Sequence, residues 1–129
     1  MPQPKILAIA GGVGGAKLAL GLARSLLPQD LTVVVNTGDD EIFHGLHVSP
    51  DLDSVTYALA GLTNPDTGWG VAGDSFRTLE ALRRLGAETW FGLGDLDLAT
   101  HIRRTALLAD GMSLSQVTAE ITRHLGIEC

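Results

Sequence analysis

The first 35 residues carry the pattern that most limits how this chain can fold. An apolar run, KILAIA at residues 5–10, leads into a glycine cluster at 11–15, and helically spaced apolar residues follow from 16 to 27. A continuous run of mostly β-branched residues, LTVVV at 31–35, comes next and is typical of a strand buried on both faces. Strand, glycine turn, helix and strand within this distance predict a βαβ unit and therefore a parallel sheet.

The rest of the sequence is richer in helices than in strands. In chain order we expect a loop or ragged short element at 36–49, a helix from Ser49 to about Ala60, a loop at 63–73, a helix from Asp74 or Ser75 to Leu85, a strand at 89–93, a helix at 95–109 and a last helix from Ser113 to Gly126. Two or three strands are few for about five helices. We therefore predict an α/β, Rossmann-like parallel sheet with flanking helices, which is incomplete in this chain and continues in a longer protein or in a partner chain.

Composition excludes several classes of protein. Of the 129 residues, 45% are hydrophobic and 19% are charged, as in soluble globular domains. Apolar runs end well before 18 residues, and the N-terminus reads as a first strand, so we expect no membrane partner and no signal peptide. The only cysteine is Cys129, which leaves no disulfide and no cysteine metal site within the chain, and we expect a cytoplasmic protein.

The charge distribution argues against nucleic-acid binding. The formal net charge is −6, and the stretch between Arg24 and Arg77 holds eight Asp and Glu residues but no Lys or Arg. Nucleic-acid binding depends on pairs between basic side chains and phosphates, which this stretch cannot supply. A phosphorylated ligand would need backbone N–H groups, a divalent cation or both. The alternative interpretation is a solvated acidic face.

The glycine cluster is a candidate phosphate or nucleotide site. Glycines between a strand and a helix let the backbone approach a phosphate, and the helix N-terminus offers free N–H groups. The spacing matches neither the Walker A loop nor the dinucleotide fingerprint, and the second strand ends in an amide instead of the acid expected for a ribose. A tight turn without a ligand is the alternative. The candidate phosphate-binding residues are Gly11, Gly12, Val13, Gly14, Gly15, Lys17 and Asn36.

An acidic segment directly follows the second strand. Asn36-Thr37-Gly38-Asp39-Asp40-Glu41 would lie beside the glycine cluster, because ligands of open α/β sheets bind beyond the carboxyl ends of the strands. Carboxylates beside a diphosphate repel it unless a metal lies between them, and Mg²⁺ binds one or two carboxylates together with phosphate oxygens. This pattern makes Asp39 and Asp40 candidate catalytic residues. The alternative is a charged loop tip.

Two further segments could hold a second ligand. In Ser49-Pro50-Asp51-Leu52-Asp53, Asp51 suits the first turn of a helix, and Asp53 is free to bind a hydroxyl-bearing ligand. Trp69 lies between Gly68 and Gly70 in a loop, where its ring could stack on a flat ring or anchor the loop.

The segment from Gly94 to His101 is ambiguous. Asp95 and Asp97 could be helix caps, and His101 could be a structural histidine. The chain shows neither a Ser-His-Asp order nor a metal spacing such as HExxH, so no covalent mechanism is suggested.

In order along the chain, these motifs resemble one family. GGVGGAKL, VVVNTGDDxxxHG, SPDLDxVxYxLAG, GWGxxGDxFxxLExLxxLG, WFxLGDxDLATHIxRT and GxSLSxVT are similar to the 2-phospho-L-lactate transferases of coenzyme F-420 biosynthesis, whose bacterial members use a phosphoenolpyruvyl donor. The resemblance covers almost the whole chain, and the ordered set is far more specific than any single motif.

The resemblance implies a reaction and roles for residues. A phospholactyl or phosphoenolpyruvyl group, joined to GMP through a diphosphate, would pass to a ribityl hydroxyl of the deazaflavin Fo, releasing GMP in an Mg²⁺-dependent reaction of a homodimer. Asp39 would bind Mg²⁺ with Asp40 next to it, Gly12 to Gly15 would face the diphosphate, and the Fo-binding residues would be Asp53, Asp51 and Trp69.

Two departures from the family pattern stand out. Leu96 occupies the position where the family usually has Arg within GDRDLATH, which affects any role for Asp95 and Asp97. Family members are more than twice this long, so residues 1–129 would be a single Rossmann-like N-terminal segment of a longer transferase. The alternatives are a fragment that is inactive alone and a non-catalytic nucleotide-binding relative.

Overall fold

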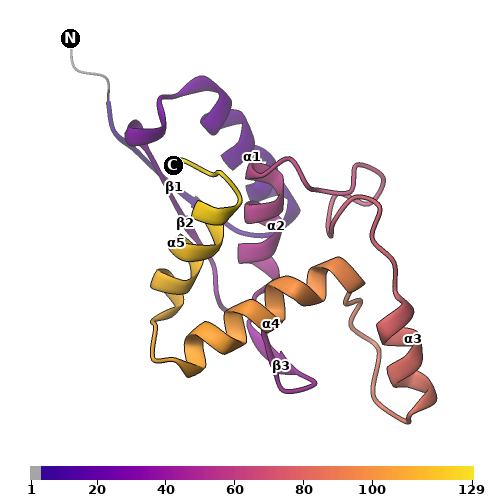
Figure 1. Cartoon of the computed structure of the whole chain (residues 1–129). Coiled ribbons are helices and arrows are strands. Elements are labelled where there is room, and N and C mark those ends of the chain that lie inside the picture. The colour runs from indigo at the N-terminus through magenta and orange to yellow at the C-terminus, as the bar shows by residue number, and fades with distance from the viewer. Residues whose placement is uncertain (1–3) are drawn as a thin grey trace.

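The computed structural model describes residues 4–129 and contains the predicted βαβ unit. Strand β1 (Ile6–Ala10) leads into α1 (Gly12–Ser25), a short 3-10 turn at Pro28–Asp30 and β2 (Leu31–Val35). The strands pair in parallel with Ile6 opposite Leu31 and Ala10 opposite Val35. The α/β prediction is therefore confirmed as a small Rossmann-like arrangement with flanking helices (Figure 1).

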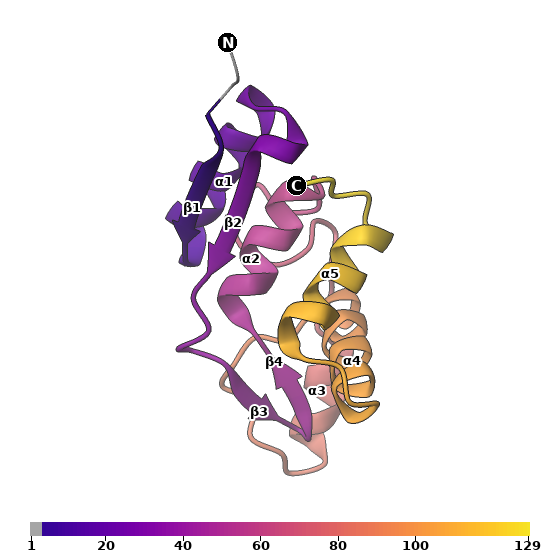
Figure 2. The same ribbon diagram turned by 90° about the vertical axis from the view of Figure 1, so that its left-hand side faces the viewer.

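The two faces of this sheet differ. One face packs on α1 and α2 (Pro50–Leu59) through a core of small and β-branched side chains: Ala10, Ala16, Ala19, Val55 and Ala58. The other face presents Leu7, Ile9 and Val34, which are 62%, 78% and 50% exposed. Figure 2 views β1 and β2 from this side, with α1 behind them. The expectation that residues 31–35 are buried on both faces is wrong for this chain.

Residues 36–49 contain a hairpin where we expected a loop or ragged element. Strands β3 (Glu41–Phe43) and β4 (Leu46–Val48) pair antiparallel around His44 and Gly45, whose φ angles are 53° and 76°. Two consecutive positive φ values are typical of the tight turns that match the twist of a hairpin. The hairpin leads directly into the start of α2.

The C-terminal half is helical: α3 (Arg77–Arg84), α4 (Asp95–Ala109) and α5 (Leu114–His124). Figure 1 shows α4 crossing the end at which α2 begins. The predicted capping box is confirmed at the start of α5, where the Ser113 hydroxyl accepts from the backbone N–H of Gln116 and the Gln116 side chain accepts from that of Ser113. No helix among residues 4–129 has the length and apolarity needed to cross a membrane.

The predicted strand at 89–93 is wrong. This segment has no regular secondary structure, because its aromatic rings pack on the hairpin instead. The Phe43 ring centroid lies 5.5 Å from that of Trp90 and 4.7 Å from that of Phe91.

Helix α3 begins at Arg77, later than the predicted Asp74 or Ser75, because the aspartate before each of two helices caps the start of the other helix. Asp95, which begins α4, accepts from the backbone N–H groups of Arg77 and Thr78 in α3. Asp74, which precedes α3, accepts from the backbone N–H groups of Leu96 and Asp97 in α4. The Ser75 hydroxyl also donates to Oδ2 of Asp95 at 2.6 Å. This hydrogen bond, followed by those from Thr78 and Arg77, holds the pKa of Asp95 well below its usual range. Leu96 itself is exposed.

Candidate functional site

The glycine cluster forms the first turn of α1. We expected the helix from Ala16, but it begins at Gly12, whose φ is 63°. A Cβ at Gly15 would lie 3.1 Å from the backbone carbonyl carbon of Ala10, so glycine lets α1 approach β1 closely. A Cβ at Gly12 or Gly14 would meet open space. The first turn holds no acidic side chain, and its N–H groups are available to an anion.

Asn36 ties the end of β2 to this turn. Its backbone N–H donates to the Ala10 carbonyl at 3.0 Å, and its Nδ2 donates to Oδ2 of Asp51 at 2.9 Å. The Asp51 carboxylate also lies against Gly11, where a Cβ would approach Oδ2 to 3.2 Å. The structure therefore places Asn36 and Asp51 beside the glycine turn, as expected for Asn36. Lys17 and Val13 are exposed on the same helix.

The two aspartates of the acidic segment have different surroundings. Asp39 is exposed. Asp40 is mostly buried, and its Oδ2 accepts from the Ser49 hydroxyl at 2.7 Å and lies 3.1 Å from Nε2 of His47. Its Oδ1 is buried and has no hydrogen-bond partner among residues 4–129. Carboxylate oxygens are the ligands that Mg²⁺ prefers, so Asp39 and the unpartnered Oδ1 of Asp40 have the donor chemistry of a magnesium site.

A cavity of about 310 Å³ opens between α2, α4 and the glycine-flanked loop. Asp53 and Trp69 both line it, although 15 residues separate them in the sequence. Asp51 does not line this cavity and faces the glycine turn instead. The remaining lining residues are Val48, Pro50, Ser54, Tyr57, Gly70, Phe91, Gly92, Asp97 and His101.

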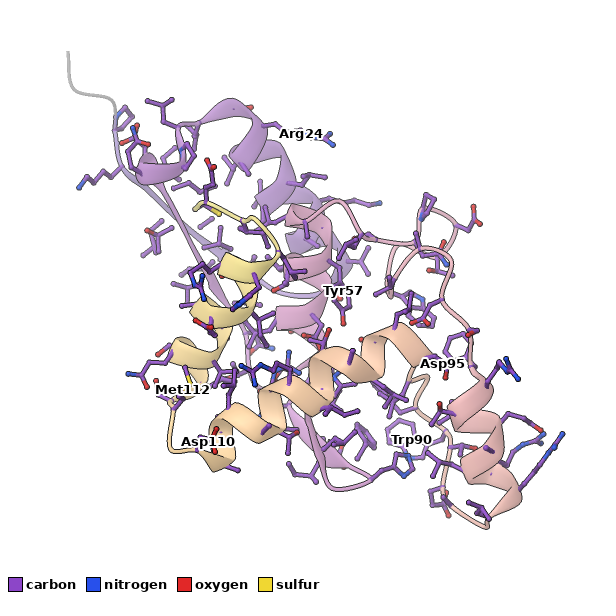
Figure 3. All side chains as sticks on the ribbon, in the orientation of Figure 1. Arg24, Tyr57, Trp90, Asp95, Asp110 and Met112 are labelled. Carbon is purple, nitrogen blue, oxygen red and sulfur yellow. The ribbon has the colours of Figure 1, made fainter. Side chains whose placement is uncertain are left out.

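The floor of the cavity is a network of buried polar side chains. Asp53 is 5% exposed and forms an ion pair with Arg104, whose Nη1 also donates to the His47 carbonyl at 3.2 Å. Tyr57 lies on α2 (Figure 3), and its hydroxyl donates to Oδ1 of Asp97 at 2.6 Å. Nδ1 of His101 lies 3.5 Å from Asp53 Oδ2 and 3.3 Å from Arg104 Nη1. We call Asp53, Tyr57, Asp97, His101 and Arg104 the buried cluster.

Burial and neighbouring charges move the pKa values in opposite directions. Burial raises the pKa of Asp53 to about 6, although Arg104 acts to lower it. Burial also opposes ionisation of Asp97, but close contact with His101 and the Tyr57 hydroxyl lowers the pKa of that carboxyl below its usual range. The pKa of Tyr57 is raised, first by burial and then by the two carboxylates, so its hydroxyl stays protonated.

The buried cluster has the donor types of a metal site but not its charge balance. One atom each of Asp53, Asp97 and His101 lie within 4.8 Å of one another. Arg104 already neutralises one of the two carboxylates, so a divalent cation would leave a net positive charge in a buried space. Burying unpaired charge is costly, and a neutral ligand suits this cluster better.

Sequence reasoning missed Tyr57, Thr100 and Arg104. A signal was present in the spacing, because residues three or four apart share one face of a helix. On α4 that face carries Asp97, Thr100, His101 and Arg104, and Tyr57 follows Asp53 by four residues on α2. The Tyr57 hydroxyl donates to Oγ1 of Thr100 at 2.8 Å.

Comparison with known proteins gives a consistent result. The family described as 2-phospho-L-lactate transferase CofD matches residues 6–129. The 2-phospho-L-lactate transferase of Methanospirillum hungatei is 47% identical over 120 residues, which cover 92% of this chain and 40% of that protein. The phosphoenolpyruvate transferase of Streptomyces avermitilis is 50% identical over 115 residues, which cover 88% of this chain and 36% of that protein.

A third relative, from another genus, has a similar identity and coverage. The phosphoenolpyruvate transferase of Mycolicibacterium smegmatis is 43% identical over 130 residues, which cover 93% of this chain and 40% of that protein. The chain thus spans about two fifths of the length of these relatives. The family match covers nearly every residue that the structure describes, and the chain belongs to the 2-phospho-L-lactate transferase CofD family.

Proposed function

We propose that this chain carries ligand sites of a transferase of coenzyme F-420 biosynthesis. The enzyme would move a phospholactyl or phosphoenolpyruvyl group from a donor activated as a diphosphate of GMP to a ribityl hydroxyl of the deazaflavin Fo, releasing GMP. The observation that carries the proposal is that Asp53 and Trp69 line one cavity, in a fold whose helix α1 begins without a side-chain cap. The cavity suits a flat ring with hydroxyls, and the N-terminus of α1 suits a diphosphate.

The donor would bind at the glycine turn. Free N–H groups at the start of α1 and the ammonium group of Lys17 attract phosphate oxygens, whereas the carboxylate of Asp51 repels them. Asp39, with Asp40 beside it, would hold an Mg²⁺ ion, because their oxygens form a hard donor set and one of them is unpartnered within residues 4–129. Bound Mg²⁺ neutralises the charge that develops on the diphosphate.

The acceptor would bind in the cavity. Trp69 is 45% exposed and lines the cavity, so its face is available for stacking on a flat ring. Transfer to a hydroxyl forms one P–O bond, breaks the P–O bond to GMP, which leaves with that oxygen, and releases the hydroxyl proton to solvent. Such a step needs positioning and charge neutralisation more than a protein nucleophile.

A second candidate is ligand binding without turnover. This candidate is favoured because the chain matches only 36–40% of the length of these relatives, so it need not contain every residue that turnover requires. A homodimer and a cytoplasmic location remain part of the proposal for the whole protein.

Fluorescence titration of the chain with Fo tests the acceptor site. Trp69→Ala should weaken binding by about 2- to 10-fold, the range expected for one aromatic stacking contact. Trp90→Ala is the matched control, because Trp90 is 72% exposed and does not itself line the cavity. Equal effects of the two changes, or no Fo binding, would contradict the acceptor site.

Mass spectrometry of GMP release separates the two candidate functions. The chain is mixed with Fo, the GMP-activated donor and Mg²⁺. Release of GMP that depends on Fo supports the transferase, and Fo binding without release supports the second candidate.

A further inference from the structure

The two carboxylate oxygens of Asp40 have different surroundings. Oδ2 accepts from the Ser49 hydroxyl at 2.7 Å and lies 3.1 Å from Nε2 of His47, whereas Oδ1 is buried and has no hydrogen-bond partner among residues 4–129. A carboxylate oxygen only accepts, so Nε2 of His47 carries the proton of its contact. Burying a polar atom without a partner costs free energy, so Oδ1 points to an ion or ligand that completes the site.

The two donors on Oδ2 fix the orientation of the Asp40 carboxylate. A single hydrogen bond leaves the terminal torsion of an aspartate free to rotate, because that torsion is broad. The second donor, the imidazole of His47, restricts this rotation. A cation on Oδ2 would compete with both donors, so the arrangement directs a cation to Oδ1.

Helix α4 holds His47 at both of its backbone groups. The backbone N–H of His47 donates to Oγ1 of Thr105 at 2.8 Å, and its carbonyl accepts from Nη1 of Arg104 at 3.2 Å. The Thr105 hydroxyl in turn donates to the His101 carbonyl at 2.7 Å. The sheet of β3 and β4 has two strands within residues 4–129, so these side chains of α4 satisfy backbone groups that a third strand would otherwise satisfy. Helix α4 therefore sets where the imidazole of His47 lies.

We propose that His47 is a positioning residue, which holds Asp40 so that its free oxygen faces the magnesium ion, and that α4 fixes His47 for this role. The proposal rests on the proposed function, in which Asp39 and Asp40 bind that ion. His47 acts through Oδ2 of Asp40 and does not touch the ion. Hydrogen-bond partners of ligating carboxylates orient them, and loss of such a partner typically lowers metal affinity about 10- to 100-fold.

Calorimetric titration with MgCl₂ distinguishes this role from a purely structural one. If His47 only supports the hairpin, its loss lowers the free energy of unfolding by urea and leaves the Mg²⁺ affinity of the folded chain unchanged. If His47 positions Asp40, the folded chain itself binds Mg²⁺ more weakly. We expect His47→Leu to raise the dissociation constant for Mg²⁺ by about 10- to 100-fold.

Two further variants assign the effect to the proposed contacts. His47→Gln should retain most of the Mg²⁺ affinity, because its side-chain amide donates from nearly the same position as the imidazole Nε2. Thr105→Val keeps the shape of the side chain but removes the acceptor of the His47 N–H, and it should weaken Mg²⁺ binding by a smaller factor than His47→Leu.

His44→Asn is the matched control. His44 is exposed at the turn of the same hairpin, and its φ of 53° is one that asparagine adopts readily. This variant removes an imidazole three residues from His47 and should leave the Mg²⁺ affinity unchanged. A loss equal to that of His47→Leu would show that the hairpin as a whole, and not His47, supports the ion, and it would overturn the proposal.

The remaining outcomes separate His47 from the magnesium site itself. No Mg²⁺ binding by the unmodified chain overturns both the site and the role of His47. Unchanged affinity in His47→Leu, or equal losses in His47→Leu and His47→Gln, overturns the role of His47 and leaves the site. Unchanged affinity in Thr105→Val overturns the part assigned to α4. If His47→Leu does not fold, His47→Asn is measured instead, since its amide is too short to replace Nε2, and unchanged affinity again overturns the role.

Discussion

Two groups of aspartates in this molecule lie in surroundings with different physical properties. In the acidic segment after β2, Asp39 is exposed and Asp40 keeps one oxygen without a partner within residues 4–129. In the buried cluster, Asp53 is paired with Arg104 and Asp97 accepts from Tyr57. The carboxylate of Asp39 is therefore exposed to solvent, whereas the carboxylates of Asp53 and Asp97 are held by internal partners.

This difference separates binding from stability. An exposed carboxylate is hydrated already, so its removal costs little folding free energy. A buried carboxylate has lost its water and depends on its partner, so removal of that partner is costly. We therefore expect loss of a charged partner in the buried cluster to change unfolding, and substitution of the exposed Asp39 to change ligand binding.

The largest expected effect is that of Arg104→Met. Arg104 is 3% exposed, and its loss leaves Asp53 buried without a counter-charge. We expect a loss of about 3–5 kcal/mol in the free energy of unfolding by urea at pH 7. Arg103→Met, at an exposed position one residue away, is the matched control and should have little effect. Similar losses in both variants would mean that the ion pair does not support the fold.

The pH dependence of stability tests Asp53 itself. Burial raises its pKa from 3.8 to about 6, so the folded state binds its proton more tightly than the unfolded state does. The stability from this group is complete below pH 3.8 and is lost as the pH rises to about 6, a decline of roughly 3 kcal/mol.

Asp53→Asn removes this decline. The variant should be less stable at pH 7 because Arg104 loses its partner, but its stability should fall less between pH 4 and pH 6 than that of the unmodified chain. Asp97, whose pKa is lowered, acts with the opposite sign in both proteins, so the difference between the two curves isolates Asp53. Parallel curves of urea unfolding against pH would show that Asp53 does not titrate in this range.

The local patterns of the sequence predicted the βαβ unit and the last helix, and long-range packing explains the errors. Hydrophobic periodicity and capping residues act within a few positions, so they are visible in one segment. The strand predicted at 89–93 failed because Trp90 and Phe91 pack on Phe43, almost 50 residues earlier. The start of α3 moved because Asp95 caps it from the next helix.

The candidate site was likewise predicted where a local rule applies and missed where the contact is long-range. Asn36 beside the glycine turn followed from the rule that ligands bind at the carboxyl ends of parallel strands. The position of Asp53 and Trp69 in one cavity was suggested only by the family resemblance. Arg104 shares a face of α4 with Asp97 and His101, but its partner Asp53 lies 51 residues away, and no local pattern connects that pair.

Ser49→Ala should have a smaller effect. Ser49 is fully buried, and its hydroxyl donates to Asp40 Oδ2 at 2.7 Å. Loss of this hydrogen bond should cost about 1–2 kcal/mol in urea unfolding, because the partner oxygen stays buried. Ser54→Ala is the control, since Ser54 makes no side-chain hydrogen bond within residues 4–129. An equal cost for both would mean that Asp40 is not tied to the fold through Ser49.

Asp39→Asn should have the smallest effect on stability and a specific effect on metal binding. Asp39 is exposed, so the free energy of unfolding should change by less than about 0.5 kcal/mol. If Asp39 binds Mg²⁺, then MgCl₂ raises the melting temperature of the unmodified chain, since a ligand of the folded state stabilises it. That shift should disappear in Asp39→Asn and persist in Asp66→Asn, a change at an exposed loop aspartate outside the site. A magnesium shift that survives Asp39→Asn would assign the ion to other oxygens and would remove the functional contrast between the exposed and buried carboxylates.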